Sequence, residues 1–315
     1  MKLSNQHSAM NLNLPDTLEG VDLDQHLALL RDEVNARLEL ILQVSPAPGT
    51  ELQSVMRYSL LGKGKRVRSI LCLLVNEAAG GAGRAFALDA GCAVEMVHAA
   101  SLILDDLPCM DDATTRRGLP ATYKKYGDAS AILASIGLLN RAYEVLAEHS
   151  STSDAIRTAA IRVLTMAVGM DGLVGGQEID LNERSKYTDA SCIEGLNWLK
   201  TGVLFSAAAE IGAIAAELEP EAIGAVKRFS RHLGVAFQTA DDLIDQEGTI
   251  QSARKDVRQD AFKPTLVSLM GKDAARYSCR QHVEESRAAL VESNLDSSML
   301  NGFVDSLLSY QTQGP

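Results

Sequence analysis

The chain has 315 residues, a formal net charge of −11 and only 4% aromatic residues. This acidic balance argues against nucleic acid as a partner, because a protein that binds nucleic acid presents a basic face to its phosphates. The five cysteines are scattered without metal-ligand spacing, so we expect free thiols in a reducing compartment. The first 20 residues lack an apolar signal segment, so we expect a cytoplasmic protein.

Composition and spacing predict an all-α fold. The chain has no proline between Pro120 and Pro220, Ala and Leu are abundant, and runs of β-branched residues are few. No Pro/Ser/Gly-rich linker or internal repeat divides the sequence. We therefore predict one all-α domain over residues 21–315, preceded by a disordered tail at residues 1–20. Charged residues such as Glu210 interrupt the most apolar runs, so we expect no membrane span.

Apolar periodicity and the positions of Gly and Pro predict helices along the whole chain. One of them carries Phe237–Asp245, and the others cover approximately Asp24–Val44, Glu51–Leu61, Ser69–Ala79, Ala87–Leu104, Gly127–Glu148, Asp154–Met170, Ser191–Leu218, Pro264–Gly271, Asp273–Glu292 and Ser297–Tyr310.

A candidate anion site lies in the segment G-K-G-K-R-V-R, Gly62–Arg68, at the start of a predicted helix. Glycines and clustered cations in this position favour anions, because free backbone N–H groups and the helix dipole add to the side-chain charges. From this segment alone, a basic solubilising turn is an equally good interpretation.

The segment Leu102–Arg117, L-I-L-D-D-L-P-C-M-D-D-A-T-T-R-R, is the strongest candidate site. Its four aspartates are Asp105, Asp106, Asp111 and Asp112. Carboxylates this dense repel one another unless cations hold them, and an all-oxygen cluster suits Mg²⁺. Arg116 and Arg117 would complete a phosphate clamp. The alternative is a solvated acidic turn, but His98 and Asp105 share one face of an otherwise apolar helix, which indicates a buried site.

Two shorter patterns follow. In G-G-Q-E-I-D, Gln177 and Asp180 are three residues apart and therefore lie on one helical face. Lys200 and Thr201 lie among apolar residues. A lysine in such a place usually extends its ammonium group to solvent, and a ligand role is the alternative.

A second acidic stripe lies in F-Q-T-A-D-D-L-I-D, where every polar group falls on one side of a helix: Gln238, Asp241, Asp242 and Asp245. Lys255 follows in a polar, basic segment. Two acidic stripes with separate basic groups predict a cavity for several Mg²⁺ ions and more than one phosphate. The apolar remainder of the same helices predicts a pocket for a hydrocarbon tail. The sequence has no P-loop, Rossmann, H-E-x-x-H or EF-hand motif, and its acids do not have the spacing of a di-iron bundle.

Together these motifs resemble the trans-isoprenyl diphosphate synthases. The matching segments are D-D-x-x-x-x-D with R-R-G (Asp105–Asp111), F-Q-x-x-D-D-x-x-D (Phe237–Asp245), G-K-R-V-R (Gly64–Arg68), Glu95–His98, G-G-Q-x-x-D and K-T. The resemblance covers about residues 25–275, and S-L-I-L-D-D-L-P-C-M-D-D is most similar to bacterial geranylgeranyl diphosphate synthases of the carotenoid-pathway type. It implies an all-α bundle of about ten or more helices around a central cavity, and a homodimer.

The resemblance also implies a mechanism, namely ionisation, condensation and elimination in head-to-tail prenyl transfer. About three Mg²⁺ ions would bind the allylic diphosphate through Asp105, Asp111 and Asp241, with Asp106, Asp242 and Asp245 assisting. The residues expected to support the leaving diphosphate are Arg116, Lys200, Gln238 and Lys255. Those expected to hold isopentenyl diphosphate are Lys65, Arg68, His98 and Arg117. Thr201, Gln177 and Asp180 match positions near the reacting carbons.

Product length is expected to depend on Ala100 and Ser101, one helical turn before the first acidic motif. Both are small, so a long tail can pass them, which favours geranylgeranyl diphosphate over the alternative, farnesyl diphosphate. Replacing Ala100 with Phe is expected to shorten the product.

Two other functions share the fold. A class I terpene cyclase has no second diphosphate site and usually a different second metal motif, and a non-catalytic partner subunit is expected to lose aspartates. This chain keeps both aspartate motifs. It departs from the family pattern at Ser69 (usually Pro), Leu104 (usually His), Ser135-Ile136 (usually Gly-Asp) and Arg258 (usually Gly), and no basic residue follows Arg287.

Overall fold

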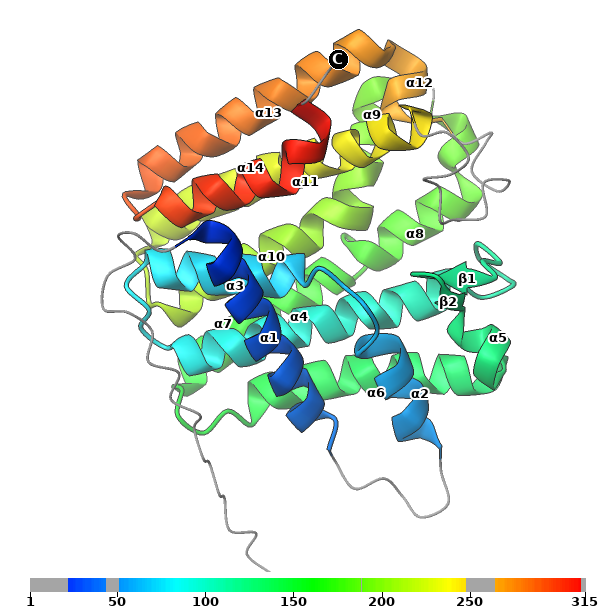
Figure 1. Cartoon of the computed structure of the whole chain (residues 1–315), viewed down its shortest axis with the longest axis horizontal. Coiled ribbons are helices and arrows are strands. Elements are labelled where there is room, and N and C mark those ends of the chain that lie inside the picture. Colours follow the sequence, from blue (N-terminus) through cyan, green and yellow to red (C-terminus); the bar gives the residue numbers. More distant parts are fainter. Residues whose placement is uncertain (1–21, 44–50, 188, 248–263, 313–315) are drawn as a thin grey trace, which may run out of the picture.

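The computed structural model describes residues 22–43, 51–187, 189–247 and 264–312, so the predicted disordered tail, Lys255 and Arg258 lie outside the described residues. The described chain has the predicted all-α fold (Figure 1). Its α-helices are α1 (Leu23–Ile41), α2 (Leu52–Leu60), α3 (Val67–Ala78), α4 (Arg84–Asp105), α5 (Thr122–Tyr126), α6 (Asp128–Ala147), α7 (Asp154–Val168), α8 (Leu173–Asn182), α9 (Ala190–Asn197), α10 (Val203–Ala215), α11 (Pro220–Glu247), α12 (Leu266–Met270), α13 (Lys272–Ser293) and α14 (Ser298–Thr312). The other elements are a 3-10 turn η1 (Arg184–Lys186), a π-helical turn η2 (Trp198–Gly202) and a hairpin of β1 (Thr115–Arg116) and β2 (Leu119–Pro120).

The helix α4 lies in the middle of the bundle, between α6 on one side and α3 and α10 on the other (Figure 1). Small residues let these helices approach closely. A Cβ atom on Gly91 of α4 would lie 3.1 Å from the Cα atom of Ser69 on α3, and one on Gly212 of α10 would lie 2.3 Å from the carbonyl oxygen of Cys72. This close packing fixes the position of α4 within the bundle.

Two of the departures from the family pattern form hydrogen bonds to α4. The hydroxyl of Ser69 donates to the carbonyl oxygen of Gly91 (2.8 Å), and the hydroxyl of Ser135 on α6 donates to the carbonyl oxygen of Ala100 (3.0 Å). Both serines are fully buried, so these bonds satisfy hydroxyl groups that water cannot reach. The substitutions therefore add cross-helix contacts to α4.

Two carboxylates in the buried part of α4 have basic partners. Asp89 accepts two hydrogen bonds from Arg37 on α1 (2.5 and 2.8 Å), and Glu95 lies 3.6 Å from Nη1 of Arg66. Buried carboxylates require such partners. These pairs hold α4 against its neighbours.

Most predicted helices lie within a few residues of the observed ones, and the long helix predicted over Ser191–Leu218 is present over Ala190–Ala215 but contains a π-helical turn. The chain there is divided into α9, the π-helical turn η2 and α10. A π turn has a wider hydrogen-bonding pattern than an α-helix and frequently marks a functional site. Lys200 and Thr201 lie in this turn. The hairpin was not predicted, because its two-residue strands leave no alternating pattern.

The expectation of no segment with the character of a membrane span is not confirmed. By length and composition alone, three helical stretches among the described residues qualify: Arg84–Asp105, Asp154–Asn182 and Ala190–Ala215. The most apolar windows of the first and third are 72% and 67% buried within the bundle, so their apolar composition serves the core. The window of the second is only 28% buried. This stretch therefore presents apolar side chains to the outside.

Candidate active site

Asp105 is the last residue of α4, and the loop after it turns back so that Asp111 lies beside it. The backbone N–H of Asp111 donates to the carbonyl oxygen of Asp105 (2.9 Å), and that of Asp112 donates to Leu107 (3.0 Å). Asp112 has a φ of 45°, and its carboxylate accepts a hydrogen bond from Tyr123 on α5 (2.6 Å). Asp105 and Asp111 are therefore separated in the sequence but adjacent in space.

The carboxyl group of Asp105 is surrounded by charges of both signs. Burial raises its pKa to about 6; Lys200 and Arg116 oppose this effect, and the carboxylates of Asp111 and Asp106 add to it. A half-buried carboxylate beside other carboxylates is stabilised by any cation that joins them. The end of α4 thus has the electrostatics of a cation site.

Asp106 is bound to Arg116 rather than open to the cavity. The residue is 1% exposed, and its carboxylate accepts hydrogen bonds from Nε (2.9 Å) and Nη2 of Arg116. The β1–β2 hairpin brings Arg116 back to the end of α4. Burial raises the pKa of Asp106, and the hydrogen bonds from Arg116 counteract this. Asp106 therefore holds Arg116 beside the other carboxylates, where Asp105 and Asp111 also act on its charge.

Asp180 on α8 holds two cations. Its carboxylate accepts hydrogen bonds from Lys200 (2.5 Å) and from Arg184 (2.5 Å), which in turn donates to the carbonyl oxygen of Pro264. Burial alone would raise the pKa of Asp180, but the two cations lower it to about 2. Gly176 permits this arrangement, because a Cβ atom there would lie 2.8 Å from the Cβ atom of Leu199 in η2. Lys200 is thereby directed into the site and not to solvent.

Thr201, the next residue in η2, contacts the second acidic motif. Its hydroxyl donates to Oε1 of Gln238 on α11 (2.9 Å), and Nε2 of Gln238 donates to Oδ1 of Asp242 (3.0 Å). Asp241 acts on the charge of Arg68 across the cavity. The side chain of Asp245 lies outside the described part of the structure, as does Lys255.

The basic side of the cavity is built on α3 and the hairpin. Burial lowers the pKa of Arg68 to about 10. The charge of Glu95 partly offsets this decrease, and the charge of Arg117 adds to it. The guanidinium lies 4.9 Å from the ring centroid of Phe205, and its buried Nε has no hydrogen-bond partner among the residues that the structure describes. A buried donor without a partner is costly unless a ligand accepts from it. Arg68 thus has the environment of an anion-binding residue.

His98 lies among these arginines. Burial lowers its pKa well below the usual value, and the charges of Arg68, Arg117, Arg116 and Arg66 add to this effect. The imidazole is therefore neutral, and it can donate one hydrogen bond to a phosphate oxygen without adding a charge.

Arg66 and Arg184 were not among the predicted site residues. Arg66 has a φ of 54° and holds the loop before α3 through Asn35 (2.8 Å) and the carbonyl oxygen of Gly62 (3.1 Å). Lys65, next to it, is exposed at the rim. Arg184 follows Asp180 by four residues, a spacing that brings side chains together on a helix and that could have been read from the sequence.

Gln177 on α8 lies against the first acidic loop. Its Nε2 is 3.9 Å from Sδ of Met110, and its Oε1 is buried with no hydrogen-bond partner in the described part of the chain. Like Arg68, Gln177 thus offers a polar group that a ligand can satisfy.

The two residues expected to set chain length lie differently on α4. Ser101 shares the face of His98 and Asp105, since the three are spaced three and four residues apart, and its hydroxyl donates to the carbonyl oxygen of His98 (3.0 Å). Ala100 is fully buried and lies five residues before Asp105, on another face. Ser101 is therefore the residue directed toward the cavity.

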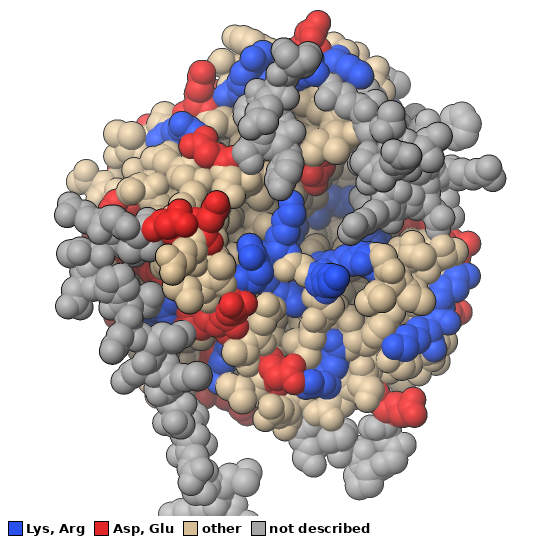
Figure 2. Space-filling model, in the orientation of Figure 1, with Lys and Arg blue, Asp and Glu red and all other residues tan. Residues whose placement is uncertain are grey.

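The two acidic motifs and the basic residues described above meet at one place. Figure 2 shows Lys and Arg side chains gathered around a hollow near the middle of this face, although the chain as a whole is acidic. The described residues thus bring together two acidic motifs, several cations and apolar side chains such as Phe205 and Phe237, whose ring centroids lie 5.2 Å apart. Such a cavity can bind a ligand with anionic and apolar parts.

Comparison with protein-family models gives a match to the family described as polyprenyl synthetase, over residues 49–291. Among curated proteins, the chain is 41% identical over 268 residues to a geranylgeranyl diphosphate synthase of Pantoea ananas, covering 82% of this chain and 87% of that protein. It is 35% identical over 258 residues to the farnesyl diphosphate synthase of Bacillus subtilis, covering 81% and 87%.

Solved structures give the same fold. An FPP/GFPP synthase of Zymomonas mobilis is similar with a TM-score of 0.78 at 34% identity, over 91% of this chain and 98% of that one. A geranyltransferase of Legionella pneumophila is similar with a TM-score of 0.81 at 27% identity, over 91% and 97%.

Proposed function

Since this chain belongs to the polyprenyl synthetase family and is a prenyltransferase, we propose that it condenses isopentenyl diphosphate with allylic diphosphates and releases geranylgeranyl diphosphate. The observation that carries the proposal is the π-helical turn η2. Within it, Lys200 acts on Asp105 of the first acidic motif, and Thr201 bonds to Gln238 of the second. Residues of both motifs therefore line one cavity in this proposal.

The donor set fits Mg²⁺, because the two motifs supply carboxylate oxygens, which are the ligands that Mg²⁺ prefers. We assign Asp105, Asp111 and Asp241 as ligands for about three ions per site, with Asp106, Asp242 and Asp245 in supporting positions. When bound, Mg²⁺ neutralises a diphosphate and makes it a better leaving group.

The chain's own cations divide between two diphosphates. Lys200, held by Asp180, and Arg116, held by Asp106, support the diphosphate that leaves the allylic substrate, with Gln238 beside them. Arg68, Arg117 and Lys65 bind isopentenyl diphosphate, and neutral His98 donates to it. Lys255 stays a prediction for the leaving group.

The reaction breaks the allylic C–O bond and leaves a carbocation. The double bond of isopentenyl diphosphate supplies the electron pair of the new C–C bond, and a proton then leaves to the released diphosphate. Water would capture the cation, so the cavity must be dry. Phe205, Phe237 and the apolar faces of α4 and α10 supply that dryness. Thr201, Gln177 and Asp180 lie near the reacting carbons in this proposal.

The test is incubation of the purified protein with Mg²⁺, isopentenyl diphosphate and dimethylallyl diphosphate, with product length as the readout. We expect a twenty-carbon diphosphate. A fifteen-carbon product would support the farnesyl alternative, with the same mechanism and a shallower pocket. No condensation at all, with both aspartate motifs intact, would support the cyclase or the partner-subunit alternative.

Replacing Ser101 with Phe is expected to shorten the main product from twenty to fifteen carbons or fewer. The side chain shares the face of His98 and Asp105, so a ring there blocks the path of the growing tail. Chromatography of the products after phosphatase treatment measures the change, and Ser101→Ala, which keeps the path open, is the control. The same product from Ser101→Phe and Ser101→Ala would remove this residue from the determination of length. Ala100→Phe, expected from the sequence to act similarly, also tests overpacking of a fully buried position.

We also propose a homodimer that acts in the cytoplasm. Large apolar side chains are exposed on one side of the bundle, on α6, α7, the turn after α7 and α8: Ile132, Leu133, Ile136, Met166, Met170 and Val174. An exposed apolar surface of this kind is typical of an interface, and a second copy of the chain would bury it. All five cysteines are free thiols, which supports a reducing compartment.

The double substitution Leu133→Glu with Ile136→Glu is expected to convert a dimer into monomers, because it places charges on side chains that are 55% and 50% exposed in one chain and buried between two. Light scattering coupled to size-exclusion chromatography measures the mass. Val291→Glu is the control: it is 77% exposed on α13, at the opposite edge of the bundle from α6 (Figure 1). A dimer that persists in the double variant would exclude this surface as the interface.

A further inference from the structure

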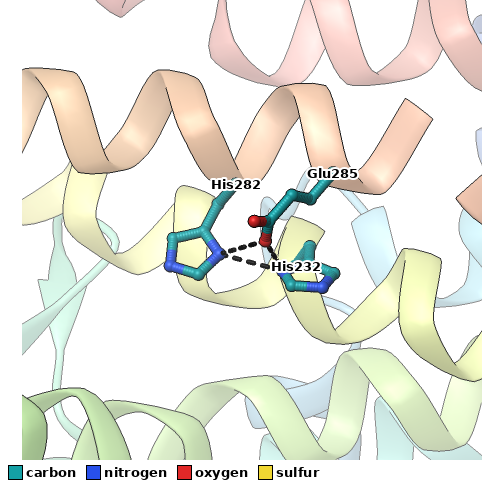
Figure 3. Close-up of side chains that lie close together, drawn as sticks. All are labelled: His232, His282 and Glu285. Atoms are coloured by element: carbon teal, nitrogen blue, oxygen red, sulfur yellow. Dashed lines mark hydrogen bonds and ion pairs between the residues drawn. The ribbon is translucent and has the colours of Figure 1, made fainter. Parts of the chain in front are cut away.

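A second cluster of metal-binding side chains lies between α11 and α13, outside the acidic cavity (Figure 3). His232 comes from α11, and His282 and Glu285 come from α13. Nδ1 of His232 lies 2.9 Å from Nδ1 of His282 and 2.9 Å from Oε2 of Glu285, and the last two atoms are 3.7 Å apart. Three potential ligand atoms from two helices thus converge on one point.

We propose that this cluster binds a borderline divalent ion such as Zn²⁺. Ligand atoms around a tetrahedral Zn²⁺ with bonds of about 2.0 Å lie about 3.3 Å apart, and the three distances here bracket that value. Imidazole nitrogens with one carboxylate suit Zn²⁺ and not Mg²⁺, which prefers oxygen. The site is therefore chemically distinct from the two aspartate motifs.

Both sides of the cluster suit a metal. The side chains of His232, His282 and Glu285 are 26%, 17% and 55% exposed, so an ion can enter and water can complete its coordination. On the far side of the His282 ring, Oε1 of Glu194 on α9 lies 3.7 Å from Nε2. A carboxylate there favours the proton on Nε2 and leaves the lone pair of Nδ1 free, as outer carboxylates do for metal-bound histidines.

The metal-free arrangement is less favourable. Two neutral imidazoles whose Nδ1 atoms are 2.9 Å apart repel each other through their lone pairs unless a proton lies between them. A shared proton satisfies one pair of atoms, whereas a cation satisfies both nitrogens and the carboxylate together. A hydrogen-bonded cluster without metal is the alternative that the experiment must distinguish.

A bound ion would join helices that also build the acidic cavity. His232 precedes Asp241 by nine residues on α11, a rise of about 13 Å, so the ion and the aspartates are separate. Glu194 belongs to α9, which continues directly into η2 with Lys200 and Thr201. Zn²⁺ at this place would stabilise the α9–α11–α13 side of the bundle, independently of the proposed reaction.

The experiment uses the full-length chain after removal of any affinity tag and treatment with EDTA. Zn²⁺ is added in the presence of millimolar Mg²⁺ and a phosphine reductant, and bound zinc is measured by competition with a chromogenic chelator. The variants are His232→Gln with His282→Gln, and Glu285→Gln. The matched control is Glu284→Gln, which removes the same charge from the neighbouring residue of α13.

We expect one more Zn²⁺ per chain in the wild type and in Glu284→Gln than in the double histidine variant, and weaker binding in Glu285→Gln. A free Zn²⁺ concentration 100-fold above its Kd should raise the Tm of the wild type by about 4 °C. Equal zinc content in the wild type and the double variant would overturn the proposal in favour of the metal-free cluster. Equal loss in Glu285→Gln and Glu284→Gln would also overturn it, because surface charge and not coordination would then explain binding. Glu285 is exposed, so its variant tests the site without disturbing the core.

Discussion

Asp105→Ala is expected to lower kcat for prenyl transfer by about 10³-fold or more, with no loss of helical content. Asp105 is the residue at which the end of α4, Asp111 and Lys200 meet, so its loss removes the central carboxylate of the proposed Mg²⁺ site. Burial raises the pKa of Asp105 to about 6, which means that folding disfavours its charged form. The ionised carboxylate therefore destabilises the fold slightly at neutral pH, and the variant should be at least as stable as the wild type. Initial rates at saturating Mg²⁺ and far-UV circular dichroism measure the two effects.

Asp112→Asn is the matched control for this prediction. It removes one negative charge from the same loop, keeps an oxygen that accepts the hydrogen bond from Tyr123, and leaves a residue that tolerates the φ of 45°. We expect a change in kcat of less than about tenfold, well below the effect of Asp105→Ala. If the two variants lost activity equally, the charge of the loop and not a ligand at Asp105 would be responsible. Asp241→Ala should match Asp105→Ala, because both motifs serve one cavity.

The sequence predicted the all-α fold and the proximity of the polar groups along each helix. His98, Ser101 and Asp105 follow helical periodicity, and so do Gln238, Asp241 and Asp242, because side-chain positions on one helix depend only on spacing. The buried surroundings of Asp105 also followed from the apolar residues before it. These inferences needed no knowledge of how the helices pack.

The pairings between elements could not be predicted in this way. Asp106 binds Arg116 only because a two-residue hairpin turns the chain back, and Asp180 reaches Lys200 only because a π turn interrupts a helix that the sequence predicts as continuous. His232 and His282 are fifty residues apart and belong to no sequence motif. Each of these contacts depends on packing or on local backbone geometry, for which single-sequence periodicity has no signal.

Lys200→Met is expected to lower kcat by about 10²- to 10³-fold while raising KM for either diphosphate by less than tenfold. Lys200 lies between Asp180 and Asp105, where its charge is fixed before the substrate arrives. A cation held in this way stabilises the diphosphate most when the negative charge of the diphosphate grows, that is, as the allylic C–O bond breaks. Steady-state kinetics with each substrate varied in turn measure the two constants. A rise in KM with unchanged kcat would mean that Lys200 only binds substrate.

Asp180→Asn tests whether the carboxylate positions Lys200. The amide keeps the shape of the side chain but removes the charge that holds Lys200 and Arg184, so kcat should fall by about tenfold or more. In the double variant with Lys200→Met, the two losses should not multiply, because Asp180 acts through Lys200. A purely structural role of Asp180 would instead give losses in kcat that multiply. Tm should fall in either case, because a buried charge pair is broken, so a double-mutant cycle on kcat separates the two roles.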